Sequence, residues 1–289
     1  MKEDHPLVES IYRVMTDGAD LSEEQILNFW VELSEIIANR INEKRDGPFT
    51  LRMSNLGKGA RQLWYERKYG NVEKFEGKTL IKFLIGDITE HLLLFLAEVG
   101  GNTVTDRQME VAVDGVKGHI DADINGVTVD AKSASSYAFR KFKDGTLVDD
   151  DSFGYIEQLS GYCVARDTDG AFLAMDKVTG ELCVYPITRK EASQVDVHGR
   201  IAYLKDAVYS DTIPDRCYPD EADGASGNRK LGVNCSYCQF KDKCWADANG
   251  GLGLRTFLYS RGPVFLTEVK KEPRVFESVK FPTKEQEEH

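Results

Sequence analysis

The amino-acid sequence predicts a mixed α/β fold, in which helices flank a central sheet of parallel and antiparallel strands. A strong helical pattern over residues 78–98 is followed by short segments of alternating hydrophobicity, then by a helix over 155–166 and two more strands. This order is typical of a sheet with helices packed against it. The chain of 289 residues, 41% of them hydrophobic, suffices for one large or two modest domains.

Two helices are expected in the first 70 residues. In residues 22–44, Ser22 and Gln25 form a capping-box pattern. Apolar residues then recur at helical spacing, and we expect this amphipathic helix to pack against the core. Residues 54–69 predict a second helix, or a turn followed by a helix, rich in aromatic and basic side chains.

The remaining elements follow from the same patterns. Three strands are expected in the first half, over 103–113, 117–124 and 127–133. Two further strands, 171–176 and 181–187, precede a helical region over 189–209. We divide the chain into a helical region (1–50), a core (51–212), a cysteine-rich segment packing on the core (213–250) and an irregular tail (251–289). The final PTKEQEEH is expected to be disordered.

Composition sets limits on location and function. The chain has 37 Lys and Arg against 48 Asp and Glu, a net charge of −11, which argues against a nonspecific nucleic-acid coat protein. It leaves room for a nucleic-acid enzyme whose carboxylates hold divalent metal. No apolar run is long enough to cross a membrane, and the N-terminus lacks the apolar core of a signal peptide. We therefore expect a cytoplasmic protein, with structural disulfides rare.

The segment GHIDADINGVTVDAKSAS, residues 118–135, predicts a hairpin with an Asn-Gly turn. If Ile124 pairs with Val127 across this turn, Asp121 lies opposite Asp130. Two carboxylates at this distance repel each other unless a cation lies between them. A divalent cation with oxygen ligands meets that need.

A lysine completes the pattern. Lys132 follows Asp130 by two residues on the same face of the strand, where it can hold and polarise a water molecule. Metal and lysine together predict a hydrolytic site. The alternative is a hairpin whose charges simply face water. Asp123 we expect to be structural or to support the ligands.

Further motifs change this balance. Glu90 lies in GDITEH on the preceding helix, and Gln158 and Tyr162 lie one helical turn apart in YIEQLSGY. The segments GDITEH, GHID, VDAKS, QLSGY and CSYCQFKDKC together resemble, in order, the motifs of the PD-(D/E)XK nuclease superfamily, in particular RecB-like and phage-type exonucleases. The resemblance covers about residues 54–245. It implies a restriction-endonuclease-like core that uses Mg²⁺ or Mn²⁺.

The resemblance also implies residue roles. Asp121 and Asp130 would bind the metal, joined by the backbone carbonyl of Ala131. Lys132 would orient the attacking water and offset charge on the phosphorane.

Glu90 fits the G-x3-E form of the first motif and is expected as a third ligand. The neighbouring His91 is expected to pack in the core or to support a ligand, with metal binding as its alternative role. Gln158 and Tyr162 match the Q-x3-Y motif near the substrate strand.

Six cysteines divide into two groups. Cys163 and Cys183 are isolated in apolar segments and are expected to be buried. The other four have spacing that suits either a tetrahedral zinc site or a cubane iron–sulfur cluster; they are Cys217, Cys235, Cys238 and Cys244. The resemblance favours a [4Fe-4S] cluster over Zn²⁺. In it the first cysteine would stand at Gly59, and Cys217 is expected to replace it.

Two basic segments are candidates for DNA contact. In RQLWYERKYG, Arg61, Trp64 and Tyr65 combine cations with aromatic rings, as single-stranded DNA sites do. The alternative is a helix that packs its rings inward. Arg140 and Lys141, in AFRKFK just after the hairpin, are better placed to contact the phosphate backbone.

These features predict a metal-dependent DNA exonuclease that acts on single strands or duplex ends in phage-type recombination, repair or DNA degradation. It would work in the cytoplasm, the host's if a phage encodes it. The alternatives are a structure-specific endonuclease on the same fold and a non-catalytic nucleic-acid-binding protein with a four-cysteine metal site.

Overall fold

A computed structural model of the chain describes residues 5–43, 47–70 and 76–278. The chain forms two compact units, each drawn from two stretches of sequence. Unit 1 comprises Met1–Lys58 and Lys74–Tyr209, and unit 2 comprises Gly59–Glu73 and Ser210–His289.

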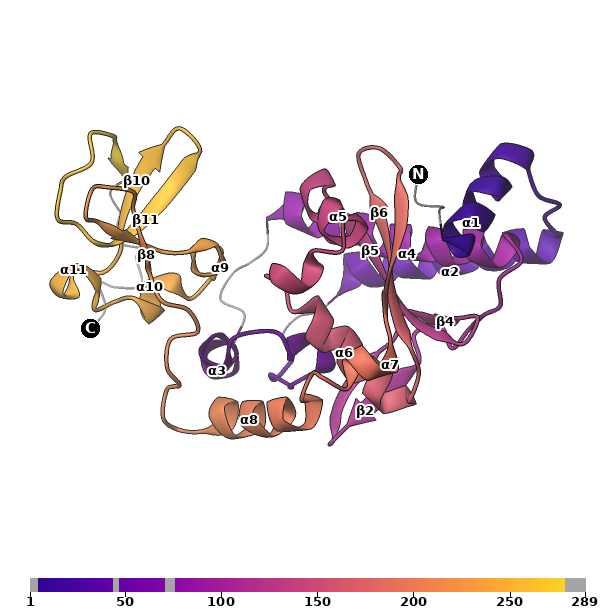
Figure 1. Cartoon of the computed structure of the whole chain (residues 1–289), viewed down its shortest axis with the longest axis horizontal. Coiled ribbons are helices and arrows are strands. Elements are labelled where there is room, and N and C mark those ends of the chain that lie inside the picture. Colours follow the sequence, from indigo (N-terminus) through magenta and orange to yellow (C-terminus); the bar gives the residue numbers. More distant parts are fainter. Residues whose placement is uncertain (1–4, 44–46, 71–75, 279–289) are drawn as a thin grey trace. The chain divides into compact units, whose positions relative to one another are not determined.

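The centre of unit 1 is a five-stranded mixed sheet (Figure 1). Its strands are, in spatial order, β1 (Val104–Thr105), β4 (Ala122–Ile124), β5 (Val127–Ala134), β6 (Gly170–Asp176) and β7 (Leu182–Ile187). The β5–β6 pair is parallel, and the other neighbours are antiparallel. The predicted mixed α/β class, with helices flanking a mixed sheet, is thereby confirmed.

Helices cover both faces of this sheet (Figure 1). Helices α1 (Pro6–Asp17) and α4 (Gly77–Val99) pack on one face, where Ile11, Leu93 and Val129 belong to one buried apolar cluster. Helices α5 (Ser136–Lys143) and α6 (Tyr155–Arg166) pack on the other face. There the Phe172 ring of β6 contacts aromatic rings from both helices. The site described below is built from both layers.

Short elements complete unit 1. Two of the predicted strands, 103–113 and 117–124, each break in two, because β2 (Glu110–Val113) and β3 (Val116–His119) form a separate hairpin. The helical region predicted over 189–209 is likewise two helices, α7 (Arg189–Ala192) and α8 (Val197–Tyr209). Two 3-10 turns, η1 (Met53–Asn55) and η2 (Leu147–Asp149), lie in the connections.

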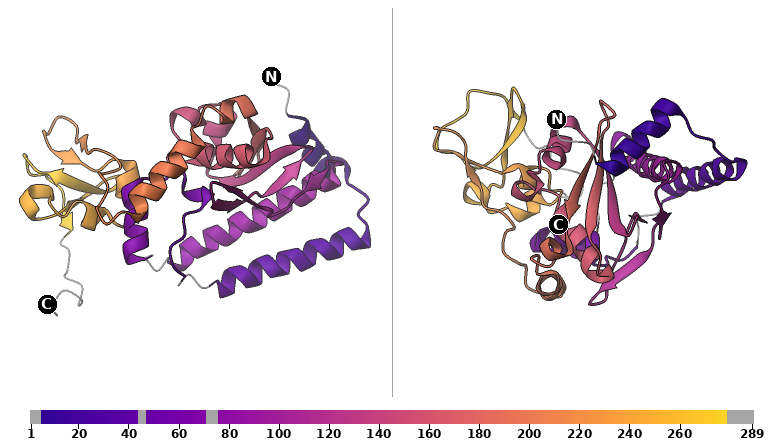
Figure 2. Two further views of the ribbon diagram at one scale, coloured as in Figure 1. Left: turned by 90° about the horizontal axis from the view of Figure 1, so that it is seen from below. Right: turned by 45° about the vertical axis from the view of Figure 1, so that its right-hand side comes forward.

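Helix α2 (Glu23–Asn42) begins at the predicted capping box, with both Ser22–Gln25 hydrogen bonds present. Its expected burial against the core is wrong. None of its residues is buried, and Trp30 is 61% exposed. The helix lies alongside α4 (Figure 2), where Phe29 stacks on His91 with ring centroids 4.7 Å apart. The core position next to α4 is taken instead by α1, which the sequence patterns did not predict.

Unit 2 combines helix α3 (Ala60–Tyr69) with the region after residue 210. A five-stranded sheet runs in the order β12 (Glu277–Ser278), β10 (Arg255–Tyr259), β11 (Gly262–Glu268), β9 (Arg229–Lys230), β8 (Glu221–Ala222). Three short helices, α9 (Val233–Ser236), α10 (Lys241–Cys244) and α11 (Ala248–Gly251), join its strands. The chain from 251 to 278 is thus an ordered part of a sheet, where the sequence suggested an irregular tail. The predicted disorder of PTKEQEEH falls outside the described residues.

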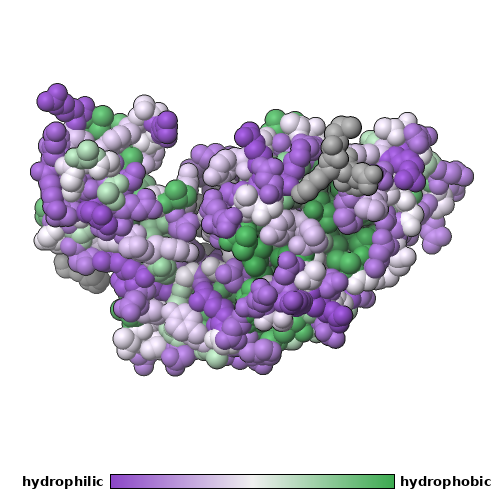
Figure 3. All heavy atoms as spheres, viewed as in Figure 1, coloured by the Kyte–Doolittle hydropathy of each residue, from purple (hydrophilic) through white to green (hydrophobic). Residues whose placement is uncertain are grey.

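The surface in Figure 3 is mostly hydrophilic, with hydrophobic side chains gathered over the central part of unit 1. In the portion of the chain that the structure describes, every helix is too short or too polar to cross a lipid bilayer.

Candidate active site

The β4–β5 hairpin has the predicted register. Ile124 pairs with Val127, and Asp123 pairs with Thr128. Both turn residues, Asn125 and Gly126, have positive φ, as a tight hairpin turn with right-handed twist requires. The Asn-Gly pair therefore fixes which side chains share a face.

Asp121 lies just before β4 rather than in the ladder. Its Oδ2 accepts a hydrogen bond from the Ala131 backbone N–H at 2.7 Å. This bond ties the carboxylate to β5 one residue beyond Asp130. The hairpin thus brings Asp121 beside the Asp130–Lys132 segment. Asp121 and Asp130 are not themselves a hydrogen-bonded pair of the β4–β5 ladder, which ends at Ala122 and Val129.

Asp130 and Lys132 form an ion pair on β5. Asp130 is 1% exposed, and the Lys132 Nζ lies 4.9 Å from the centre of the Tyr155 ring. Gln158 Nε2 lies 3.5 Å from Asp130 Oδ1. The buried carboxylate is therefore held between a cation on its own strand and an amide from α6.

Gln158 and Tyr162 meet on one face of α6, as their spacing predicts. Gln158 Nε2 donates to the Tyr162 hydroxyl at 3.1 Å, and Tyr162 is buried. The glycine of GHID makes this packing possible. A Cβ at Gly118 would lie 2.7 Å from Tyr162 Cε1 and 2.8 Å from Met53 Cβ.

A second close approach fixes where α6 begins. A Cβ on Gly57 would lie 2.1 Å from the Gly154 Cα. Gly154 also has φ of 72°, a left-handed conformation that favours glycine. The two backbones therefore pack directly, which places the first turn of α6 next to β5.

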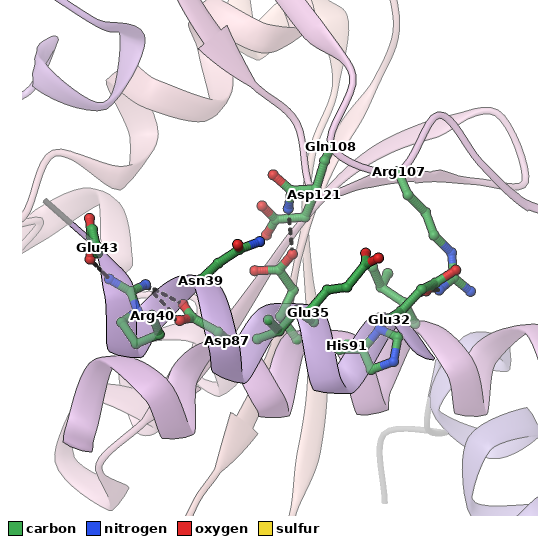
Figure 4. Close-up of a pocket in the computed structure, with 13 residues that line it drawn as sticks. Glu32, Glu35, Asn39, Arg40, Glu43, Asp87, His91, Arg107, Gln108 and Asp121 are labelled. Carbon is green, nitrogen blue, oxygen red and sulfur yellow. Dashed lines mark hydrogen bonds and ion pairs between the residues drawn. The ribbon is translucent and has the colours of Figure 1, made fainter. Parts of the chain in front are cut away.

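Glu90 reaches the site from α4. Its Oε1 accepts a hydrogen bond from Gln108 Nε2 at 2.7 Å. Glu90 and Asp121 both line a cavity of about 570 Å³ between α2, α4 and the strand connections (Figure 4). Asp130 and Lys132 are not among the residues that line this cavity.

The cavity is acidic and is closed on one side by α2. Arg40 of α2 makes a two-pronged ion pair with Asp87 of α4, at 2.7 and 2.8 Å (Figure 4). Asn39, also on α2, points toward Asp121. Further carboxylates line the wall: Glu32, Glu35 and Glu43.

His91, a candidate ligand by sequence, faces α2. Its Nε2 lies 3.2 Å from the Phe29 carbonyl oxygen and its Nδ1 lies 3.5 Å from a Glu32 carboxylate oxygen. With its ring stacked on Phe29 and 6% exposed, His91 has the environment of a packing residue.

Two of the carboxylates, Glu90 and Asp121, have raised pKa values. Burial, followed by the charge of Asp130, raises the pKa of Glu90 to about 7. Burial and then the charges of Asp130 and Glu90 raise the pKa of Asp121 well above its ordinary value. Burial alone would lower the pKa of Lys132, but Asp130 and Asp121 together raise it above its ordinary value. Three carboxylates thus share one poorly solvated region with a single nearby ammonium group.

This donor set suits a hard divalent cation. Carboxylate oxygens are the ligands that Mg²⁺ and Mn²⁺ prefer, and a dication relieves the repulsion that raises these pKa values. In the described residues, no group of three or more His, Cys, Asp and Glu side chains is arranged ready to hold a metal ion. The reason is visible in the contacts: Asp130 is turned to Lys132, Asp121 to Ala131 N–H, and Glu90 to Gln108.

Asp123 has a separate structural role. Its Oδ1 accepts a hydrogen bond from the Gly126 N–H at 2.7 Å, which supports the turn. Its Oδ2 accepts from the Arg166 guanidinium at 3.0 Å. Both oxygens are thus engaged in holding the hairpin.

The residues expected at DNA differ in exposure. On α5, Arg140 is exposed, whereas Lys141 pairs with Asp150 at 2.7 Å. In unit 2, Trp64 and Tyr65 are 4% and 5% exposed, and Trp64 Nε1 donates to Ser210 O. These two rings are covered by the chain, which is the arrangement of the alternative, a helix that packs its rings inward. Arg61 donates to the Pro214 carbonyl at 3.1 Å.

The four clustered cysteines converge in unit 2, where all of them line one cavity of about 30 Å³. Burial and then the nearby thiols of Cys244, Cys238 and Cys217 raise the pKa of Cys235 to about 11. The six cysteines, all within the described residues, form no disulfide bond with one another. Four thiols around one cavity provide the donor set that zinc and iron–sulfur clusters prefer. Cys163 is buried, as predicted, whereas Cys183 is partly exposed.

Two residues of the site were missed by sequence reasoning. Tyr155 lies three residues before Gln158, and helical spacing placed both on one face, so that signal was available. Gln108 precedes a short strand and meets Glu90 across a long sequence separation. No local sequence pattern identifies Gln108 as a residue of the site.

Comparison with known proteins gives structural neighbours only. Neither a protein-family model nor a curated protein sequence matches the chain. An alkaline exonuclease from Laribacter hongkongensis matches with 13% identity and a TM-score of 0.39, over 60% of this chain and 90% of that one. A phage-related exonuclease from Haemophilus somnus 129PT matches with 13% identity and a TM-score of 0.38, over 55% and 92%.

A third solved structure, SSO0001, has 16% identity and a TM-score of 0.38 and covers 72% of this chain and 91% of that chain. The neighbours thus include exonucleases, the class that the sequence motifs resemble. Because the scores and identities are low, we base the functional proposal on the site itself.

Proposed function

We propose that the protein is a metal-dependent deoxyribonuclease of the PD-(D/E)XK type that acts as an exonuclease. The observation that carries this proposal is the buried Asp130–Lys132 pair, which shares one electrostatic cluster with Asp121 and Glu90. An acidic metal site beside a fixed ammonium group is the arrangement that phosphodiester hydrolysis requires.

Asp121, Asp130 and Glu90 would hold Mg²⁺ or Mn²⁺, with the Ala131 carbonyl as a further ligand. When bound, such an ion supplies a Lewis acid at the phosphate and lowers the pKa of a coordinated water. Gln108, which lines the same cavity, donates a hydrogen bond to Glu90 Oε1.

Lys132 contributes as a cation rather than as a base. Since its pKa is raised, the side chain stays protonated and can only donate hydrogen bonds. It would orient the attacking water and offset negative charge at the scissile phosphate. The Tyr155 ring limits where the ammonium group can move.

Gln158 and Tyr162 would position the substrate strand. Their hydrogen bond leaves the second Gln158 N–H and the Tyr162 hydroxyl oriented by α6 beside Asp130. The exposed Arg140 on α5, with Lys141 behind it, offers positive charge to a phosphate backbone.

The four cysteines of unit 2 would bind a structural metal centre, with a [4Fe-4S] cluster as the first candidate and Zn²⁺ as the second. Such a centre lies among α3, Phe240 and Trp245 in unit 2. It would stabilise that unit and take no part in hydrolysis.

A digestion assay tests the function. Purified full-length protein is incubated with Mg²⁺ or Mn²⁺ on a linear duplex, a linear single strand and a covalently closed circle. We expect nucleotide release from the linear duplex and the linear single strand, and we expect the circle to stay intact. EDTA should abolish cleavage of both linear substrates. Cleavage of the circle would replace the exonuclease with the endonuclease alternative. No cleavage of any substrate, with metal binding intact, would favour the non-catalytic binding protein.

A further inference from the structure

The side chain of Cys217 fills the space in which a side chain at position 59 would stand. A Cβ built on Gly59 would lie 2.1 Å from Cys217 Sγ and 2.6 Å from Cys217 Cβ. No atom pair without a bond tolerates such a distance. A side chain at residue 59 and the present Cys217 therefore exclude each other.

The backbone of Gly59 gives no other reason for glycine. Its φ of −67° and ψ of 136° are values that any residue adopts. It occupies the N-cap position of α3, where Ser, Thr, Asp or Asn would add a side-chain hydrogen bond, and that bond is missing. Neither the backbone conformation nor helix capping favours glycine at position 59. The close approach of the Cys217 thiol explains why a glycine stands there.

The thiol at this point adjoins the cavity that the other three clustered cysteines line. Cys217 lines the same cavity as Cys235, Cys238 and Cys244, with Arg61 and Tyr65 of α3 beside them. Helix α3 is separated by well over a hundred residues from the chain segment it contacts, and Trp64 Nε1 donates to Ser210 O at 2.8 Å across that separation. The cavity therefore lies where three stretches of unit 2 meet: α3, the segment 210–217 and the segment 235–244.

We propose that positions 59 and 217 are interchangeable sources of the fourth thiolate of a metal centre, and that this centre joins α3 to the rest of unit 2. Cys217 supplies the ligand from the segment 210–217. Residue 59 must lack a side chain so that the Cys217 thiol can occupy this position. The metal is one that prefers thiolate, either an iron–sulfur cluster or Zn²⁺. This inference rests on the proposed metal-binding role of the cysteines, and it is independent of the nuclease chemistry of unit 1.

The test measures metal content in the full chain purified without oxygen. Iron, acid-labile sulfide and zinc per chain are determined, together with visible absorption and thermal unfolding. Iron and sulfide together with visible absorption identify an iron–sulfur cluster, and zinc alone identifies a zinc site. The variants are Cys217→Ala, Gly59→Ala and the double variant Gly59→Cys/Cys217→Ala, with Cys183→Ala as a control thiol outside the cavity.

We expect Cys217→Ala to lose most of the metal and to lower the melting temperature. Gly59→Ala is expected to do the same, since its methyl group displaces the thiol. The double variant regains metal and stability, because the thiol returns from position 59. The control keeps the wild-type content.

Three results would overturn the inference: wild-type protein without iron or zinc after reconstitution, Cys217→Ala with full metal content, or a double variant with no more metal than Cys217→Ala. Rescue by the double variant keeps the test decisive even if the single variants fold poorly. Metal content is read without DNA, so its outcome is separate from success or failure of the digestion assay.

Discussion

Burial, followed by the charges of Asp130 and Glu90, raises the pKa of the Asp121 carboxylate well above its ordinary value. Replacing it with asparagine removes one of the repelling charges and keeps the shape. We expect Asp121→Asn to raise the unfolding free energy of the metal-free protein by about 1 kcal/mol. We expect it to lower nuclease activity by more than about 100-fold. Urea unfolding in EDTA and a digestion assay measure the two effects.

Asp123→Asn is the matched control, since Asp123 is paired with Arg166 and with the turn. That change should lower stability instead. If both variants destabilised the metal-free protein equally, the repulsion at Asp121 would be absent.

Glu90 gives the metal-free protein a pH dependence. Its pKa is about 7 in the folded chain against an ordinary 4.5, so the folded state binds the proton more tightly. The stability from this group is complete below pH 4.5 and is lost as the pH rises through about 7. Thermal unfolding in EDTA should therefore show a loss of stability across this range that Glu90→Gln reduces. An unchanged profile in Glu90→Gln would assign the dependence to other groups.

Residue spacing predicted that three charged side chains of the hairpin lie close together. Asp130 and Lys132 lie two apart on a strand, and the Asn-Gly turn places Asp121 beside them, so local geometry alone predicts the cluster. Gln108 was not predictable, because it reaches Glu90 by tertiary folding. The direction in which each carboxylate turns depends equally on such distant partners.

Among the elements, α6 depends on the glycine of GHID. Gly118→Ala would bring its methyl group to 2.7 Å from the Tyr162 ring and 2.8 Å from Met53. We expect a loss of about 1–3 kcal/mol in unfolding free energy, since the Tyr162 ring and Met53 are both buried and must shift. Activity should fall as well, because Tyr162 holds Gln158 beside Asp130. Chemical unfolding and the digestion assay measure both.

Gly86→Ala in α4 is the opposite case. Among the described residues, no atom outside the helix's own backbone lies within 4 Å of a Cβ built there, and the residue is helical. Alanine should stabilise the protein by about 0.5–1 kcal/mol. A destabilising Gly86→Ala together with a neutral Gly118→Ala would contradict the packing described for both helices.

The elements that sequence predicted are those with strong local signals. Helix α6 was placed at its exact limits, and α2 begins at its capping box. The exposure of α2 could not be predicted, because periodicity shows that a helix has an apolar stripe but not what packs against it. In the structure, α1 occupies the position on the sheet that α2 was expected to take. Strands such as β10 and β11 were missed because their sequence is short and irregular in hydrophobicity.

At the scale of the whole molecule, the two units are expected to unfold separately. Each has its own sheet and its own buried apolar cluster. Calorimetry of the metal-loaded protein should show two transitions, and removing the thiolate-bound metal should lower only that of unit 2. A single transition that shifts as a whole would show that the units unfold as one.

The most direct test of the central claim compares Lys132→Ala with the wild type on end-labelled linear DNA in Mg²⁺ or Mn²⁺. Lys117→Ala is the matched control, because that lysine is 64% exposed on β3 and pairs with Glu110. We predict a loss of more than about 100-fold for Lys132→Ala and the wild-type rate for Lys117→Ala. Equal cleavage by wild type and Lys132→Ala would contradict the proposed mechanism.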